Sequence, residues 1–168
     1  LSERVNNFIQ IDIDLTSDWD ESLLPENLHA IIHLAQAENF RMFPEKAKEV
    51  FYINTLSTLK LINYAAEKKL SHFVYASSGG IYGNGEDTFT ENDVLTYKKE
   101  TGFYVATKHT SEVILENYFN QLNVFILRFF FVYGEGQKQE MLIPRLINFV
   151  KNGERITLQG ELGIKINP

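Results

Sequence analysis

Cysteine is absent from the 168 residues of this chain, and so are long hydrophobic runs and clusters of basic residues. Without cysteine, neither a disulfide framework nor a thiolate metal site can form. The longest apolar run, residues 124–133, is interrupted by Arg128 and is about half the ~20 residues of a spanning helix, so we expect no membrane segment. The formal net charge of -6 is spread along the chain, which argues against nucleic acid as a partner.

A start methionine and a signal peptide are also missing, because residue 1 is Leu and the first residues have no charged or apolar leader pattern. We therefore expect an internal piece of a longer, cytoplasmic protein. What is present suffices for one core, since 44% of the residues are hydrophobic and 13% aromatic. His33 has no carboxylate or thiolate at ligand spacing, so we expect it to pack at a strand end and we expect no metal.

Short apolar segments rich in β-branched residues alternate with longer segments of helical periodicity. Strands are predicted over residues 8–15, 30–34, 72–76, 124–130 and 156–158. Helices are predicted over residues 44–70, 102–120 and 142–152. The strand segments are nearly continuous in apolar residues, which is typical of a parallel sheet covered by helices. The predicted fold class is therefore α/β, a doubly wound parallel sheet with helices on both faces.

A Tyr-x-x-x-Lys pattern occurs twice, and it places a phenol and an ammonium on one face of a helix. With 8 Tyr in the chain a chance match is expected, so the position in the fold must decide between the two. Ser78 ends a predicted strand, at the sheet edge where ligands bind, and Tyr104 follows one loop later. We predict that Ser78, Tyr104 and Lys108 converge on one substrate carbonyl. The pair Tyr64 and Lys68 is interpreted as a solvated helix end.

These residues resemble the extended short-chain dehydrogenase/reductase family, in particular the NAD-dependent epimerase/dehydratase branch that includes UDP-galactose 4-epimerase. The resemblance covers nearly the whole chain. It is carried, in the family's order, by residues 12–13, 33–36, 54, 75–83, 104–108, 127–134 and 156–160. It implies a partial Rossmann-like NAD(P)-binding domain over residues 1–168 that lacks the first βαβ unit and the C-terminal substrate domain. Residues from about 141 onward would lead into that missing domain.

The resemblance also implies the ligands and the residues that contact them. It implies NAD as the cofactor, with NADP not excluded, a nucleotide sugar as the substrate, and a homodimer. The implied catalytic residues are Ser78, Tyr104 and Lys108. The implied cofactor-binding residues are Asp12, Ile13, Leu34, Ala35, Gln36, Asn54, Ala76, Ser77, Tyr104, Lys108 and Phe130. The implied substrate-binding residues are Ser78, Gly79, Gly80, Tyr104, Phe131 and Met141.

Two of the implied cofactor residues have a plainer alternative. Asp12 can be an ordinary turn residue at the end of a strand, and Asn54 can be a satisfied amide inside a helix. Both alternatives stay open at the level of sequence.

The expected chemistry is proton and hydride transfer at one carbinol. The ammonium of Lys108 is expected to lower the pKa of Tyr104 toward working pH, so that the phenolate takes a proton from a substrate hydroxyl held by Ser78. Hydride would pass to the nicotinamide, and in an epimerase it would return to the other face of the ketone.

Several positions depart from the family's pattern. Gly79 and Gly80 stand where dehydratases carry an Asp-Glu pair, so we rank dehydration below epimerisation and carbonyl reduction. Phe131 and Met141 replace amide side chains, which favours a less polar substrate. A second reading, from a different class, is a non-catalytic dinucleotide-sensing module. A third, structural reading makes the predicted helices around residues 53–66 and 104 a dimer face, and it is compatible with the enzyme.

Overall fold

The computed structural model describes residues 9–83, 88–93, 95 and 102–157. Between Arg128 and Phe129 the chain divides into two compact units, and each is described by itself.

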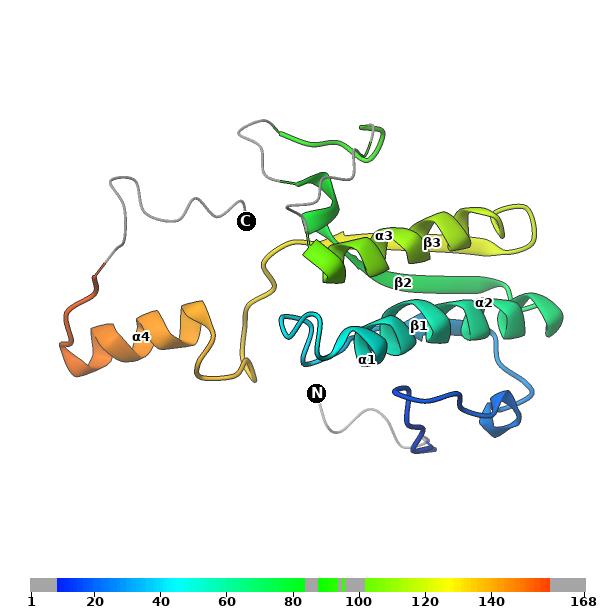
Figure 1. The fold of residues 1–168 in the computed structure, drawn as a ribbon, viewed down its shortest axis with the longest axis horizontal. Helices are drawn as coiled ribbons and strands as arrows, with labels where there is room; N and C mark the ends of the chain where they lie inside the picture. The colour runs from blue at the N-terminus through cyan, green and yellow to red at the C-terminus, as the bar shows by residue number, and fades with distance from the viewer. Residues whose placement is uncertain (1–8, 84–87, 94, 96–101, 158–168) are drawn as a thin grey trace. The chain divides into compact units, whose positions relative to one another are not determined.

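Three strands form the sheet of the first unit, in the order β1-β2-β3 (Figure 1). They are β1 (Ala30–His33), β2 (His72–Ser78) and β3 (Asn123–Phe129). β1 and β2 pair in parallel, with His33 opposite Tyr75. Because the strands are parallel, their carboxyl ends lie at the same edge, and this edge carries the candidate site. The predicted parallel α/β class is confirmed.

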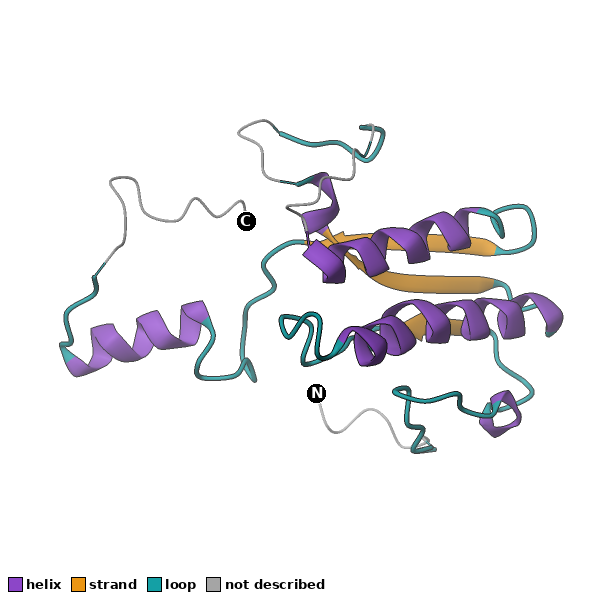
Figure 2. Ribbon diagram, viewed as in Figure 1, coloured by secondary structure: helices purple, strands orange, loops and turns teal. Residues whose placement is uncertain are grey.

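The helices of this unit cover one face of the sheet (Figure 2). The helix predicted over residues 44–70 is present as one continuous helical stretch. It consists of α1 (Ala47–Phe51), a π-helical turn (Tyr52–Leu56) and α2 (Ser57–Glu67). α3 (Gly102–Glu116) packs against α2 and β2. The side chains between them form the core, which consists of Ile62, Ala65, Leu70, Phe73, Tyr75, Leu115 and Leu122.

Among the described helices of the first unit, none packs on the second face of the sheet. Burial alternates along β2 and β3, and Ile32, Phe125 and Leu127 are exposed, Ile32 by 64%. Because these exposed side chains are apolar, the strand segments are nearly continuous in apolar residues in the sequence.

Two predicted strands are wrong for the residues that the structure describes. Residues 9–15 form no strand, and β1, the sheet's edge, pairs only with β2. A strand needs a hydrogen-bonded neighbour, and this segment has none among the described strands. Residues 156–157 are likewise irregular. Phe8 and Leu158, which the two predictions also included, lie outside the described residues.

The second unit contains α4 (Leu142–Asn152), which has the predicted bounds. The helix ends at Gly153, whose φ of 65° lies in the left-handed region that glycine adopts without strain. Its backbone N–H bonds the carbonyl of Val150 at 3.2 Å.

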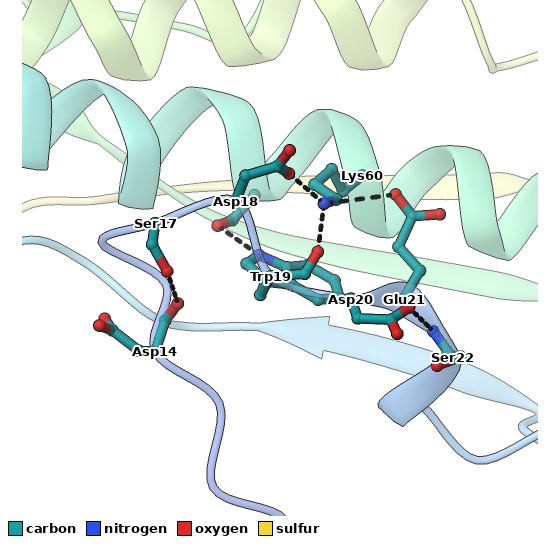
Figure 3. A network of polar contacts seen from close by, with 9 residues as sticks. Asp14, Ser17, Asp18, Trp19, Asp20, Glu21, Ser22 and Lys60 are labelled. Carbon is teal, nitrogen blue, oxygen red and sulfur yellow. Dashed lines mark hydrogen bonds and ion pairs between the residues drawn. The ribbon is translucent and has the colours of Figure 1, made fainter.

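Lys60 and Trp19 fasten the N-terminal segment onto α2 (Figure 3). The ammonium of Lys60 donates to Asp18 Oδ1 at 2.5 Å and to the carbonyl oxygen of Trp19, and it lies 4.9 Å from the centre of the indole ring. The indole N–H of Trp19 donates to Ser57 Oγ at 3.1 Å, and the side chain is only 6% exposed. This contact fixes a segment without regular strand structure on the helix.

We expect Trp19→Phe to lower the free energy of unfolding by about 1–2 kcal/mol, because it removes the bond to Ser57 and leaves part of the indole volume empty. Urea denaturation measures the change. Ser57→Ala breaks the same bond from the other side, so the two substitutions should be less than additive. Full additivity would contradict the contact.

Candidate active site

Ser78 lies where β2 ends and a short 3-10 turn (Gly79–Tyr82) begins. Its Oγ accepts a hydrogen bond from the backbone N–H of Gly80 at 3.2 Å. The neighbouring hydroxyl of Ser77 is buried and has no hydrogen-bond partner in the described structure. The end of β2 therefore presents two hydroxyls at the ligand-binding edge of the sheet.

Lys108 reaches the same strand end from α3. Its side chain is 1% exposed, and its Nζ donates to the backbone oxygen of Ala76 at 2.9 Å. The ammonium also lies 4.9 Å from the ring centre of Tyr75. Burial lowers the pKa of Lys108 to about 8.

Tyr104 stands one helical turn before Lys108. Its phenol donates to Gln36 Oε1 at 3.0 Å, and its ring centre lies 4.7 Å from that of Phe40. Burial raises the pKa of Tyr104, and the nearby hydroxyl of Ser78 lowers it in part. The turn after Ser78 also packs against α3, so the hydroxyls of Ser78 and Tyr104 lie in the same region.

The pKa of Tyr104 differs from the sequence-based expectation. Lys108 was expected to lower it, yet the net shift is upward, because the phenol loses hydration. The ammonium of Lys108 is directed at the Ala76 carbonyl instead. In this state the phenol is neutral near neutral pH, and it is a proton donor.

Asn54 connects the loop after β1 to α3. Within the π-helical turn it is fully buried, its Oδ1 accepts from the N–H of Ala37 at 3.3 Å, and its Nδ2 donates to Thr107 Oγ1 at 3.0 Å. This is the satisfied amide that the sequence left open as the alternative. A direct contact with a cofactor stays a prediction.

The other implied cofactor and substrate residues differ in their surroundings. Leu34 and Gln36 are exposed in the loop after β1, and Ala35 is half-buried. Asp12 is exposed and accepts from Gln10 Nε2 at 3.0 Å, and Ile13 is half-buried. In the second unit, three implied residues are exposed: Phe130, Phe131 and Met141. Their roles stay predictions.

The second Tyr-x-x-x-Lys pair is structural. The phenol of Tyr64 donates to the backbone oxygen of Pro25 at 2.6 Å, and Lys68 lies 5.8 Å from the centre of the Tyr64 ring. Contrary to the expected solvated helix end, Tyr64 is buried. At the helix end, Glu67, Lys68 and Lys69 are exposed.

One feature of the site was not found in the sequence: Arg128, Glu112 and Tyr82 form a polar network next to the Ser78 turn. Its signal was present, since Arg128 interrupts an apolar strand. His33 packs at the end of β1 as expected, and its buried Nε2 is unpaired among the described residues. Across the described residues, no group of three or more His, Asp or Glu side chains could hold a metal ion. None of the described helices combines the length and apolar character needed to cross a membrane.

His33 is expected to make the protein sensitive to acid. Burial, and then the charge of Lys108, lower the pKa of His33 from 6.5 to about 4. As the pH falls from 6.5 to about 4, the unfolded chain binds a proton that the folded state does not, so the free energy of unfolding should fall by about 3 kcal/mol. Urea denaturation across this range tests it. His33→Gln should remove that part of the pH dependence, whereas a matched His109→Gln should keep it; equal slopes would contradict the account.

A parallel α/β sheet with Ser, Tyr and Lys side chains gathered at one strand end defines a Rossmann-like protein of the short-chain dehydrogenase/reductase class. A profile of the NAD dependent epimerase/dehydratase family matches residues 1–164. The chain therefore belongs to the NAD dependent epimerase/dehydratase family.

Individual relatives are similar over most of this chain. The human dTDP-D-glucose 4,6-dehydratase is 28% identical over 137 residues, which are 80% of this chain and 39% of the relative. The uncharacterized UDP-glucose epimerase YtcB of Bacillus subtilis is 30% identical over 164 residues, which are 96% of this chain and 50% of the relative. The structure of MoeE5 in complex with UDP-glucose and NAD is similar with a TM-score of 0.69 and 28% identity, covering 89% of this chain and 48% of MoeE5. The chain thus spans half or less of the length of these proteins.

Proposed function

We propose that the protein containing this chain is an NAD(P)-dependent epimerase of a nucleotide sugar that works through a 4-keto intermediate. The observation that carries the proposal is the packing of α3, which carries Tyr104 and Lys108, against the turn after Ser78, with the buried ammonium of Lys108 on the backbone of the same strand. Relatives with a dehydratase or an epimerase name, and a neighbour that holds UDP-glucose and NAD, support the substrate class.

In this proposal Ser78 and Tyr104 bind one substrate oxygen. Ser78 holds the carbinol oxygen by a hydrogen bond, and Tyr104 takes the proton from it during oxidation and returns the proton during reduction. The ammonium of Lys108 is held on the Ala76 carbonyl of the same strand, and in this state it does not offset the effect of burial on the pKa of Tyr104. To act as the base in oxidation, the phenol must first release its own proton to solvent and leave its hydrogen bond to Gln36.

The residues present fit a nicotinamide cofactor. Among the described residues the buried hydroxyl of Ser77 has no hydrogen-bond partner, and Leu34, Ala35 and Gln36 lie at the same sheet edge, after β1. When bound, the nicotinamide would accept a hydride from the carbinol carbon and give it back. We propose that Ser77 and the loop after β1 hold it.

The turn after Ser78 argues against dehydration. A Cβ placed on Gly80 would lie 3.2 Å from Val105 Cγ2 and 3.3 Å from Ser78 Oγ. A side chain here would therefore require the Val105 side chain or the Ser78 hydroxyl, which the proposed mechanism needs, to shift by a few tenths of an ångström. Because neither Gly79 nor Gly80 offers a carboxylate, the turn holds no acid to protonate a leaving hydroxyl.

A second candidate function is carbonyl reduction with a reduced nicotinamide. The raised pKa of Tyr104 favours it, because a neutral phenol is the acid that this reaction requires. Reductase and epimerase differ in the fate of the cofactor. A reductase exchanges its nicotinamide in every cycle, whereas an epimerase keeps it.

The experiment is to purify the protein that contains this chain and to look for bound nicotinamide by absorbance. UDP-, GDP- and dTDP-sugars are then screened for interconversion without added cofactor. The proposal expects one epimer pair to interconvert with no net change in the cofactor. Stoichiometric consumption of NAD(P)H with a carbonyl substrate would favour the reductase. Binding of the cofactor with no reaction of any of these sugars or carbonyls would favour the sensing module.

A further inference from the structure

We propose that Glu112 and Arg128 are positioning residues that act through Tyr82 on the turn carrying Ser78. The inference deepens the proposed function, since it rests on a catalytic role for Ser78.

The first part of the network is an ion pair between the buried Glu112 and the partly buried Arg128. Glu112 is 1% exposed and lies on α3, one helical turn after Lys108. Arg128, near the end of β3, contacts Glu112 Oε2 from Nη2 at 2.8 Å and both carboxylate oxygens from Nε at 3.2 Å. Two nitrogens of the planar guanidinium thus hold one carboxylate, and the orientation of the third nitrogen is fixed.

That third nitrogen reaches the turn after Ser78. Arg128 Nη1 donates to the phenol oxygen of Tyr82 at 2.7 Å and to the backbone oxygen of Glu91 at 3.4 Å. The guanidinium carbon also lies 5.0 Å from the ring centre of Tyr82. Tyr82 is the last residue of the 3-10 turn that Ser78 caps, so its anchor is only four residues from the serine hydroxyl.

The turn needs such an anchor because of its composition. Glycine occupies positions 79, 80 and 83, and Gly83 has a φ of 77°. Glycine loses more conformational freedom on folding than any other residue, so this turn is intrinsically mobile. Apart from Ile81, which is buried, Tyr82 is the residue of the turn whose side chain can be tied down.

The network has a geometric consequence for the site. A buried ion pair adds little net stability compared with apolar residues of the same size, but it fixes the atoms that it joins. Here it joins α3, which carries Tyr104 and Lys108, to the turn that carries Ser78. The relative position of the serine and tyrosine hydroxyls therefore depends on Arg128.

Tyr82→Phe tests the link, because it removes one phenol oxygen and leaves the ion pair and the ring in place. Amide hydrogen exchange at Gly80 and Gly83 should become about tenfold faster, the size expected for losing one hydrogen bond to a charged group. In the assay of the proposed function, kcat should fall about tenfold while the KM for the sugar changes little. Tyr118→Phe is the matched control, since it removes a phenol contact with Asn63 beyond the other end of α3, and it should change neither quantity.

Unchanged exchange at Gly80 and Gly83 would overturn the proposal, and so would a lower melting temperature with an unchanged kcat. Arg128→Lys keeps the positive charge but loses the planar guanidinium that contacts Glu112 and Tyr82 at the same time. Its amide exchange and kcat should therefore resemble those of Tyr82→Phe instead of the wild type. A wild-type protein that converts no sugar would contradict the proposed function. The exchange comparison would still decide whether Arg128 and Tyr82 hold the turn.

Discussion

Replacing Tyr104 by Phe is expected to lower kcat by about 10²–10⁴-fold, the range over which a positioned acid or base contributes. The ring stays in contact with Phe40, so the fold and the affinity for the sugar should change little. What disappears is the hydroxyl that donates to Gln36 and that is proposed to exchange a proton with the substrate. Steady-state kinetics of the epimerase reaction measure the loss.

Tyr64→Phe is the matched control for this substitution. It removes the phenol oxygen of the second Tyr-x-x-x-Lys pair, which donates a hydrogen bond to the Pro25 carbonyl. We expect it to reduce stability slightly and to leave kcat unchanged. Equal kcat values for the wild type and Tyr104→Phe would remove the basis of the proposed mechanism.

Lys108→Met is expected to reduce kcat by about 10²-fold or more and also to change the pH dependence of stability. The pKa of Lys108 is about 8 in the folded state and 10.5 in the unfolded chain. Between these values the unfolded state holds a proton that the folded state has lost, so the free energy of unfolding of the wild type rises with pH. Relative to Lys108→Met, the wild type should gain about 3 kcal/mol across this interval.

The comparison with Lys68→Met isolates the effect of burial. Lys68 is exposed at the end of α2, so the difference between wild type and Lys68→Met should stay flat over the same pH range. Denaturant titrations at several pH values give both curves. If the difference in the free energy of unfolding between the wild type and Lys108→Met were also independent of pH, the ammonium would be hydrated in the folded protein, contrary to the structure.

The sequence predicted those elements whose signal is local. The helix at residues 142–152 has the predicted bounds, and β2 and β3 lie within two residues of theirs, because an apolar run or a helical period is visible in a short window. The segment at residues 9–15 has the same β-branched composition, yet it forms no strand. Its state depends on a neighbouring strand, which composition does not encode.

In the candidate site, too, some features follow from the local sequence and others depend on the rest of the fold. The order of Ser78, Tyr104 and Lys108 along alternating strands and helices places them at one sheet edge, and the structure brings them there. The upward shift in the pKa of Tyr104 was not predictable, because it depends on how much water the fold removes from the phenol. The bond between Arg128 and Tyr82 joins residues 46 positions apart, and no spacing rule indicates it.

The most direct test is a crystal structure of the protein with the cofactor and a nucleotide sugar bound. The account predicts one carbinol oxygen of the sugar within ~2.6–3.2 Å of both the Ser78 hydroxyl and the Tyr104 phenol, with the bond from Tyr104 to Gln36 broken. A sugar bound elsewhere, with the phenol still donating to Gln36 and no substrate oxygen between the two hydroxyls, would contradict it.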